Sequence, residues 1–285
     1  MYFTESIHNH LVKTVREKKE LRFLSKQFIL DEFFEYCRLH KTMRTTIAEY
    51  SCETFAKSKE LKLLVKHIRQ KSRKIYGIFQ NEKLLTKREL LKSMDFSNPD
   101  IISILQSHVS TKERLPYYEE FFFQIFTITG NPSSILDLAC GLHPVAYYHF
   151  TKLTQTTYTA CELSEVECEQ LQDFFDSNGF KAKAQALNIV KEYETIPKAH
   201  YDVCFLLKTL DTCEHQRRYI TYDILKAIHA NFIVASFPIQ NVKGIKMNRD
   251  STIHWFEKMI QRLDFHFKTI EFEGEIVYIL QKVTP

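Results

Sequence analysis

The segment Ile135-Leu136-Asp137-Leu138-Ala139-Cys140-Gly141-Leu142-His143-Pro144 decides the fold class. Its apolar start has the character of a buried strand, and its small residues then lead into a new helix. Small residues at the end of a strand allow a ligand to approach the backbone closely. A phosphate cradle needs the glycines of G-x-G-x-x-G, whereas this turn contains only Gly141. The turn is therefore typical of a ligand site without phosphate groups, with an ordinary strand-to-helix turn as the alternative.

After Pro116, short β-branched or aromatic runs alternate with helical segments. Such alternation predicts a doubly wound α/β fold, in which helices cover a parallel sheet. Gly274 separates the last two runs, which predicts an antiparallel hairpin at the edge of that sheet. This order is the class I methyltransferase variation on the nucleotide-binding sheet. The runs expected to form strands are residues 134–138, 158–162, 186–189, 202–207, 231–237, 267–273 and 276–281.

The front of the chain has a different pattern. From Ile7 to Leu105, apolar residues recur at three- and four-residue spacing, which is helical periodicity. One glycine, Gly77, and one proline, Pro99, interrupt this stretch, so we expect several helices joined by short turns. The sequence therefore predicts an all-helical N-terminal domain at 1–105 and an α/β domain at 106–285.

Charge is distributed unevenly along the chain. Residues 1–115 carry a net charge of +9 and residues 116–285 one of −5, which together give the +4 of the whole chain. The most basic stretch, residues 57–92, has twelve Lys or Arg against three acids. A basic half suggests a polyanionic partner such as RNA, because phosphate neutralisation dominates nucleic-acid affinity. A solvated helical surface is the alternative.

Cysteine usage and the N-terminal residues indicate the compartment. The seven cysteines include no C-x-x-C pair and lie mostly in apolar runs, so we expect free thiols in a reducing environment. The first thirty residues lack the apolar core of a signal peptide, and no stretch has the length of a membrane span. We therefore expect a cytoplasmic protein with no membrane partner.

Two positions suggest S-adenosylmethionine as the cofactor. This molecule carries no phosphate, so a single small-residue turn at Gly141 is enough to seat its methionyl part. Glu162 lies twenty-five residues after Asp137, at the end of the second expected strand. Doubly wound folds place there an acid that accepts hydrogen bonds from a ribose. A capping or surface charge is the alternative for Glu162.

Other catalytic motifs are missing from the sequence. It has no G-x-S-x-G elbow, no H-E-x-x-H helix and no Cys/His cluster with zinc spacing. Cys140 follows an apolar strand without an obvious basic neighbour, so packing is its expected role. We therefore expect no metal and assign no catalytic residue.

Several motifs together resemble a known family. They are Ser110-Thr111-Lys112-Glu113-Arg114-Leu115-Pro116-Tyr117-Tyr118-Glu119, the segment 136–144, Leu206-Leu207-Lys208-Thr209-Leu210, Ser236-Phe237-Pro238, and Glu275-Ile276-Val277-Tyr278-Ile279-Leu280-Gln281-Lys282. In this order and spacing, the run from Ser110 to Lys282 resembles the aminoglycoside-resistance 16S rRNA (guanine-N(7)) methyltransferases. The helical first half is compatible in character but is not matched by motif.

The resemblance implies a partner and a set of site residues. The partner would be 16S rRNA within the 30S ribosomal subunit, and methylation there could give antibiotic resistance. Arg114 would pair with the methionyl carboxylate, a role that also suits its planar fork. The implied cofactor contacts are Arg114, Gly141, Glu162, Asn188, Ile189, Leu206 and Leu207. The basic residues expected to contact RNA are Lys66, Arg69, Lys71, Arg73, Lys74 and Lys208.

The chain departs from the family pattern at several positions. His143 stands where Asn is usual, and Glu162 and Asn188 stand where Asp is usual. Glu162 keeps its charge, and Asn188 keeps one acceptor, so both substitutions are compatible with cofactor binding. Asp211-Thr212-Cys213 replaces a Pro-Cys-Leu run close to where a target base would enter, so it bears on the choice of target nucleotide.

The expected acceptor is nitrogen seven of a decoding-site guanine. This atom has a lone pair and no proton to lose, so positioning rather than a general base would drive the reaction. Phe237, Trp255 and Phe256 are candidates for stacking on an extruded base, with packing in the core as the alternative. Two other functions stay open. One is methylation of a small molecule or another RNA, and the other is RNA binding with a vestigial cofactor site.

Overall fold

The computed structural model describes residues 4–80, 85–240 and 249–282. Contacts divide the chain into two compact units. Unit 1 comprises Met1–Glu82 and Ser164–Val166, and unit 2 comprises Lys83–Leu163 and Glu167–Pro285. Residues 85–105, grouped with the helical half by their periodicity, thus pack within unit 2. The division of function between residues 1–105 and 106–285 stays a prediction.

Unit 1 is helical, as its apolar periodicity predicts. Serine side chains begin three of its helices, because Ser25, Ser51 and Ser58 each accept a hydrogen bond from a first-turn backbone N–H. The longest helix buries one stripe of residues, including Leu64 and Ile68. The helices are α1 (Glu5–Arg16), η1 (Lys19–Leu21), α2 (Lys26–Leu39), α3 (Lys41–Ala48), α4 (Cys52–Lys57), α5 (Lys59–Ile75) and η2 (Gly77–Phe79).

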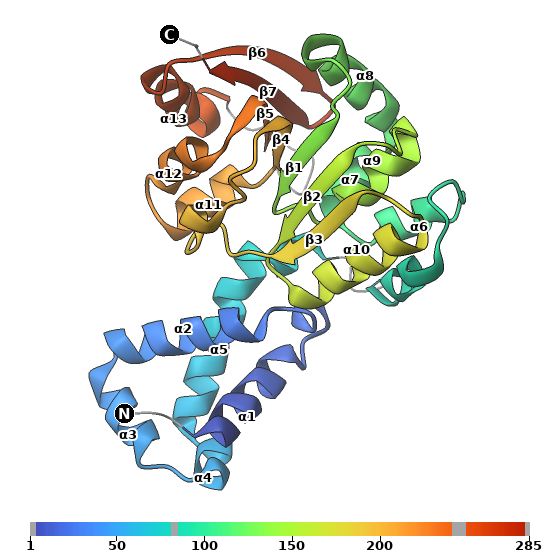
Figure 1. Cartoon of the computed structure of the whole chain (residues 1–285). Helices are drawn as coiled ribbons and strands as arrows, with labels where there is room; N and C mark the ends of the chain where they lie inside the picture. The colour runs from blue at the N-terminus through green and yellow to red at the C-terminus, as the bar shows by residue number, and fades with distance from the viewer. Residues whose placement is uncertain (1–3, 81–84, 241–248, 283–285) are drawn as a thin grey trace. The chain divides into compact units, whose positions relative to one another are not determined.

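Unit 2 contains a seven-stranded sheet in the described part of the chain, with the order β3-β2-β1-β4-β5-β7-β6 (Figure 1). The first five strands pair in parallel, and β7 pairs antiparallel with both β5 and β6. The doubly wound fold and its closing antiparallel hairpin are therefore confirmed. The strands are β1 (Ser134–Leu138), β2 (Thr157–Glu162), β3 (Ala182–Ala186), β4 (Tyr201–Leu207), β5 (Ala230–Pro238), β6 (Phe265–Phe272) and β7 (Glu275–Lys282).

The third strand was predicted in the wrong place. Sequence periodicity favoured residues 186–189, whereas β3 ends at Ala186. As an edge strand, β3 has no fully buried residue, so its alternating Lys183 and Gln185 gave a weak apolar signal. The apolar Leu187 and Ile189 that attracted the prediction are buried just beyond the strand end.

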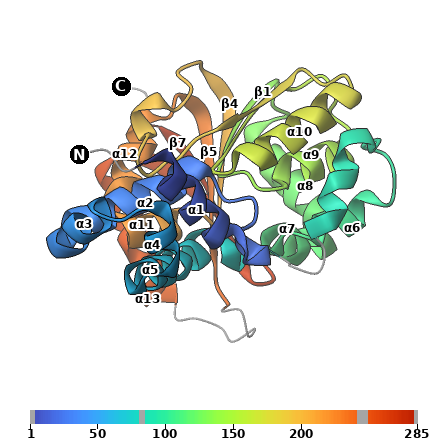
Figure 2. The same ribbon diagram turned by 90° about the horizontal axis from the view of Figure 1, so that it is seen from below.

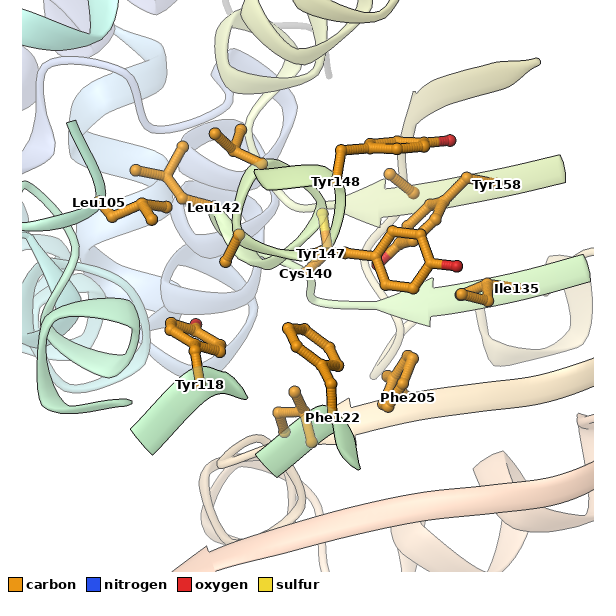
Figure 3. Close-up of a cluster of buried hydrophobic side chains, with 14 of the residues drawn as sticks. Leu105, Tyr118, Phe122, Ile135, Cys140, Leu142, Tyr147, Tyr148, Tyr158 and Phe205 are labelled. Carbon is orange, nitrogen blue, oxygen red and sulfur yellow. The ribbon is translucent and has the colours of Figure 1, made fainter. Parts of the chain in front are cut away.

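Helices cover both faces of the sheet (Figures 1 and 2). One face packs against α8, α9 and α10 through a cluster rich in aromatic rings, among them Tyr118, Phe122, Tyr147 and Tyr148 (Figure 3). The other face packs against α11, α12 and α13. The helices of unit 2 are η3 (Leu85–Ser93), α6 (Ile101–Leu105), α7 (Val109–Arg114), η4 (Leu115–Tyr117), α8 (Tyr118–Thr129), α9 (His143–Thr151), α10 (Glu165–Ser177), η5 (Tyr193–Thr195), α11 (Leu210–Gln216), α12 (Ile220–Ala227) and α13 (Arg249–Arg262).

Candidate active site

The turn after β1 has a backbone that requires glycine. Gly141 has φ +52°, and a Cβ there would lie 2.8 Å from Nε2 of His108. Ala139 also has positive φ, at 53°, and the N–H of Cys140 donates to the carbonyl of Cys161 at 3.1 Å. The chain therefore turns sharply at the carboxyl end of the sheet, where parallel α/β folds bind their ligands.

Glu162, at the end of β2, is held against this turn. Its Oε2 accepts a hydrogen bond from the N–H of Gly141 at 2.9 Å, and its Oε1 accepts one from Leu163 at 2.7 Å. Burial and the nearby Glu167 raise the pKa of Glu162 to about 7, although the two N–H donors lower it. Two predicted site residues, Gly141 and Glu162, are thus brought together.

A buried hydrogen-bond group lies behind the turn. Oδ2 of Asp137 accepts from the hydroxyl of Tyr158 at 2.7 Å and lies 2.9 Å from Nδ1 of His143. All three side chains are buried. His143, at the position where the family usually has Asn, therefore links β1 to the start of α9 and supports the turn from within the core.

Arg114, in α7, forms a buried ion pair with Glu275, the first residue of β7. Its Nε and Nη2 donate to the two carboxylate oxygens at 2.8 and 2.5 Å. Burial by itself would lower the pKa of Arg114, but the Glu275 carboxylate reverses the sign and raises it. Burial would raise the pKa of Glu275, yet Arg114 and Lys208 hold it at about 2. Both groups are therefore charged at neutral pH.

Arg114 and Tyr118 carry hydrogen-bond donors beside the ion pair with Glu275. The ion pair with Glu275 uses Nε and Nη2 of Arg114, so Nη1 lies outside that pair. The buried hydroxyl of Tyr118 lies beside the guanidinium of Arg114, which acts to lower the pKa of Tyr118, and in the described part of the chain this hydroxyl makes no hydrogen bond of normal geometry. Burial raises the pKa of Tyr118, so the hydroxyl keeps its proton. The Tyr118 hydroxyl and Nη1 of Arg114 are therefore the groups on this side of the site that would donate hydrogen bonds to a ligand.

Lys208 lies in the same cluster and is only 7% exposed. It follows β4 with φ +54°, and its N–H donates to Oγ of Ser236 at 3.0 Å. Its Nζ donates to Glu113 at 2.6 Å and lies 3.7 Å from Glu275. The ammonium expected to contact RNA is therefore paired with carboxylates beside Arg114.

The remaining predicted cofactor residues line the ends of the neighbouring strands. Ile189, Leu206 and Leu207 are buried. Oδ1 of Asn188 accepts from the N–H groups of Val190 and Lys191 at 3.2 and 3.3 Å, so this side chain fixes the turn after β3. Its amide nitrogen is the group left for a ligand.

The five basic residues predicted to bind RNA lie on α5 and fall into two groups. Three of them connect helices within unit 1: Lys71 pairs with Glu32 at 2.6 Å, Arg73 with Glu20 at 2.7 Å, and Arg69 with Glu17 at 3.2 Å. Lys66 and Lys74 are exposed and have no ion pair within the described ranges.

A hollow of about 660 Å³ lies along α5 in unit 1. Lys62 and Lys66 line it together with Lys18, and none of the three forms an ion pair in the portion of unit 1 that the structure describes. Its full lining is His10, Thr14, Glu17, Lys18, Ala56, Leu61, Lys62, Val65, Lys66, Arg69, Gln70 and Arg73.

The aromatic candidates for base stacking are mostly core residues. Phe237 and Phe256 are 0% exposed, with ring centroids 4.7 Å apart, so for these two candidates the structure shows the alternative, packing in the core. Both rings are covered because Phe237 lies on β5, an interior strand, and Phe256 lies on α13, which packs against that strand. Trp255 is half-buried, with its ring 6.0 Å from Phe237.

Sequence reasoning missed His108 and the roles of Glu275 and Glu113. His108 contacts the Gly141 turn, and burial together with the charges of Arg88 and Arg114 lowers its pKa well below the usual value. Glu275 is 161 residues away from its partner, so no local spacing connects them. The one available signal was an acid placed directly before five apolar residues of the same strand.

Two further findings concern metals and membranes. Across residues 4–80, 85–240 and 249–282, no group of three or more His, Cys, Asp or Glu is placed to hold a metal ion. Within those same ranges, no helix combines the length and the apolar character needed to cross a bilayer. All seven cysteines are free thiols.

The chain is similar to ribosomal RNA methyltransferases. A family model described as ribosomal RNA methyltransferase (FmrO) matches residues 51–279. A 16S rRNA (guanine(1405)-N(7))-methyltransferase of Frankia casuarinae is 29% identical over 231 residues, covering 76% of this chain and 80% of the relative. One of Micromonospora echinospora is 27% identical over 235 residues, covering 76% and 82%.

Solved structures share the fold of the whole chain. The 16S rRNA methyltransferase RmtF, crystallised with S-adenosyl-L-homocysteine, aligns with a TM-score of 0.77 and 20% identity over 99% of this chain and 100% of its own. The 16S rRNA methylase RmtB aligns with a TM-score of 0.73 and 19% identity over the same shares.

Proposed function

Since the chain belongs to the FmrO family of ribosomal RNA methyltransferases, we propose that it transfers a methyl group from S-adenosylmethionine to nitrogen seven of a guanine in 16S rRNA. The two relatives are named for methylation of guanine 1405 of 16S rRNA. We propose the same decoding-site guanine as the target of this chain. We further propose that the substrate is the RNA within the 30S subunit, that the reaction takes place in the cytoplasm, and that aminoglycoside resistance is its consequence.

The residues at the carboxyl edge of the sheet fit this cofactor. Nη1 of Arg114 lies outside the pair with Glu275 and would donate to the methionyl carboxylate, and the buried Tyr118 hydroxyl beside Arg114 would donate to it as well. Gly141 has no Cβ, which lets the His108 ring lie against the turn, and its exposed backbone would lie beside the methionyl chain. Glu162 would accept hydrogen bonds from ribose hydroxyls, while Asn188 and Ile189 would flank the adenine. When bound, S-adenosylmethionine supplies an electrophilic methyl group.

In the proposed reaction these residues position the two reactants and need not remove a proton. Burial raises the pKa of Cys140, the thiol next to Gly141, well above its usual value, so this thiol stays protonated at neutral pH and is a poor nucleophile. Guanine nitrogen seven needs no proton removed, so orientation of the reactants suffices, an effect that is worth about 7–11 kcal/mol at its largest. The observation that carries the proposal is the pairing of Glu162 with the Gly141 turn beside the buried Arg114 cluster.

The cofactor assignment is tested by calorimetry with Arg114→Gln and Glu162→Gln. Each lost charge-assisted contact should weaken S-adenosylmethionine binding by about 1.5–3 kcal/mol. Phe123→Ala, at an exposed position on α8, is the control and should bind as the parent does. Parent-like affinity in both variants would mean that the cofactor site lies elsewhere.

The substrate class is tested with labelled cofactor. We expect methyl transfer to isolated 30S subunits and none to a panel of small metabolites. Transfer to free RNA or to a metabolite instead would favour the alternative methyltransferase function. Cofactor binding without any transfer, or RNA binding without cofactor binding, would favour a binding protein with a vestigial site.

We propose that RNA phosphates bind along the α5 hollow of unit 1. Lys18, Lys62 and Lys66 line it without a carboxylate partner in the described part of unit 1. Arg69 and Arg73 also line it, but their ion pairs hold the helices together, so neutralising them would confuse loss of folding with loss of binding.

The test therefore uses the three lysines. Lys18, Lys62 and Lys66 changed together to Gln should weaken 30S binding and lower the salt slope of log K by about 2–3, at roughly 0.7–0.9 per phosphate contact. A triple variant of Lys13, Lys41 and Arg44, which lie in unit 1 outside the hollow, is the charge-matched control. Equal salt slopes in the two triple variants would contradict a specific role for the hollow.

A further inference from the structure

The turn between α11 and α12 presents aromatic and basic side chains to solvent. Tyr219 is 60% exposed and Tyr222 is 37% exposed, and Arg217, Arg218 and Lys226 belong to the same segment. We define the α11–α12 surface as Arg217, Arg218, Tyr219, Tyr222 and Lys226. It has no part in the cofactor site described above.

This surface is held in one shape by its own hydrogen bonds. The carboxylate of Glu214 accepts from the N–H groups of Tyr219 and Thr221, both at 2.8 Å, and so caps the start of α12. Arg217 donates to Asp223 at 2.7 Å. The exposed rings are therefore presented by an ordered turn rather than by a loose loop.

Tyr219 adopts a left-handed backbone conformation, with φ +66°. Glycine suits this conformation, whereas a bulky side chain is strained in it. Because the ring is 60% exposed, burial of the side chain does little to compensate for this strain. Such a combination is typical of a residue kept for contact with a partner.

Each ring of the surface lies beside a cation. The guanidinium carbon of Arg218 is 5.0 Å from the ring centroid of Tyr219, and Nζ of Lys226 is 5.3 Å from that of Tyr222. Neither cation has a carboxylate partner among the described residues. The α11–α12 surface therefore places two aromatic rings and two cations next to one another.

We propose that the α11–α12 surface binds unpaired nucleotides of the RNA substrate, with Tyr219 and Tyr222 stacking on bases and Arg218 and Lys226 neutralising phosphates. Aromatic rings among cations are the means by which proteins hold single-stranded nucleic acid. The inference rests on the proposed function, because it presupposes an RNA substrate.

The position of the surface suits this role. Helix α11 begins at Leu210, three residues after the end of β4, and its seven residues span about 10 Å at 1.5 Å each. The surface thus lies a short distance from the edge of the sheet that holds the cofactor residues. Nucleotides near the target base would be within its reach.

The test exploits the strained backbone. Tyr219→Gly removes the ring and relaxes the left-handed conformation, so the variant should melt at the parent's temperature or above it. Combined with Tyr222→Ala, it should weaken binding to 30S subunits and to a labelled oligoadenylate by about 5- to 150-fold for each base that loses its stacking partner. Calorimetry should give the parent's affinity for S-adenosylmethionine.

The matched control is Phe123→Ala. Phe123 is 69% exposed on α8, but its neighbours along the helix are Glu119 and Glu120, so it lacks the cations of the α11–α12 surface. Its variant should bind both RNA probes as the parent does.

The outcomes separate this inference from the proposed function. If the Tyr219→Gly/Tyr222→Ala variant binds both probes like the parent, the inference is wrong while the proposed function stands. If it loses 30S binding but keeps oligoadenylate binding, the surface contacts a ribosomal protein and the RNA assignment is overturned. A parent protein that binds and methylates no 30S subunit would instead refute the proposed function.

Discussion

Replacing Glu275 by Gln should destabilise unit 2 through its effect on Arg114. The carboxylate accepts hydrogen bonds from Nε and Nη2 of Arg114 and lies 3.7 Å from Nζ of Lys208. A glutamine has the same shape but leaves the buried guanidinium without a counter-charge. Breaking one side of a buried ion pair costs about 3–5 kcal/mol.

The pKa of Glu275 gives a second measure of the same effect. It lies at about 2 rather than 4.5 because Arg114 and Lys208 outweigh the effect of burial. At 1.36 kcal/mol per pKa unit, this shift corresponds to about 3 kcal/mol, in agreement with the first figure. Since the pKa is lowered on folding, the stabilisation is fully present above pH 4.5 and is lost as the pH falls toward 2.

Urea unfolding followed by the fluorescence of Trp255, the single tryptophan, measures this stability. We expect Glu275→Gln to lose about 3 kcal/mol at neutral pH, with the gap to the parent narrowing in acid. Glu273→Gln, which changes an exposed acid two residues away, should stay within about 0.5 kcal/mol of the parent. Equal stability of Glu275→Gln and the parent at neutral pH would refute the reasoning.

Three further predictions concern the turn, the thiols and the ribose acid. Gly141→Ala should abolish cofactor binding and lower stability, because the added Cβ would clash with the His108 ring. Gly179→Ala should lower stability alone, because Gly179 has φ +66° but open space around it. Calorimetry measures the cofactor affinity of each variant, and melting curves measure its stability. Of the seven cysteines, only Cys52 should react quickly with an aromatic disulfide in the native protein, since the others are buried; fast modification of a second thiol would contradict the packing. The affinity for S-adenosylmethionine should rise as the pH increases through about 7. Burial and a neighbouring acid raise the pKa of Glu162 to that value, and ribose hydroxyls donate best to the ionised carboxylate. The Glu162→Gln variant should show little change of affinity with pH.

The sheet and its turn could be predicted because their signals are local. Buried parallel strands are continuous apolar runs, so β1 was predicted with its observed bounds. Once β1 and β2 are identified, the Gly141 turn and Glu162 can be predicted as site residues because they stand at the carboxyl ends of these two strands. The edge strand β3 escaped because half-exposed residues carry little pattern.

The charge network of the site could not be predicted from local pattern. Arg114 and Glu275 meet only because β7 inserts between β5 and β6, which places the start of the last strand near α7. In the same way, the ion pairs of Lys71 and Arg73 depend on helix packing in unit 1. A count of basic residues does not distinguish Lys71 and Arg73, which form ion pairs between helices, from Lys66, which forms none among the described residues.

The central claim is that the chain methylates nitrogen seven of a guanine in 16S rRNA. The direct measurement is primer extension on RNA from 30S subunits that were incubated with the protein and S-adenosylmethionine, after borohydride reduction and aniline cleavage. A guanine methylated at nitrogen seven yields a strand break, and we expect one new break at the decoding-site guanine that depends on cofactor. The absence of that break, with the methyl group recovered on adenine, cytosine or protein, would contradict the claim.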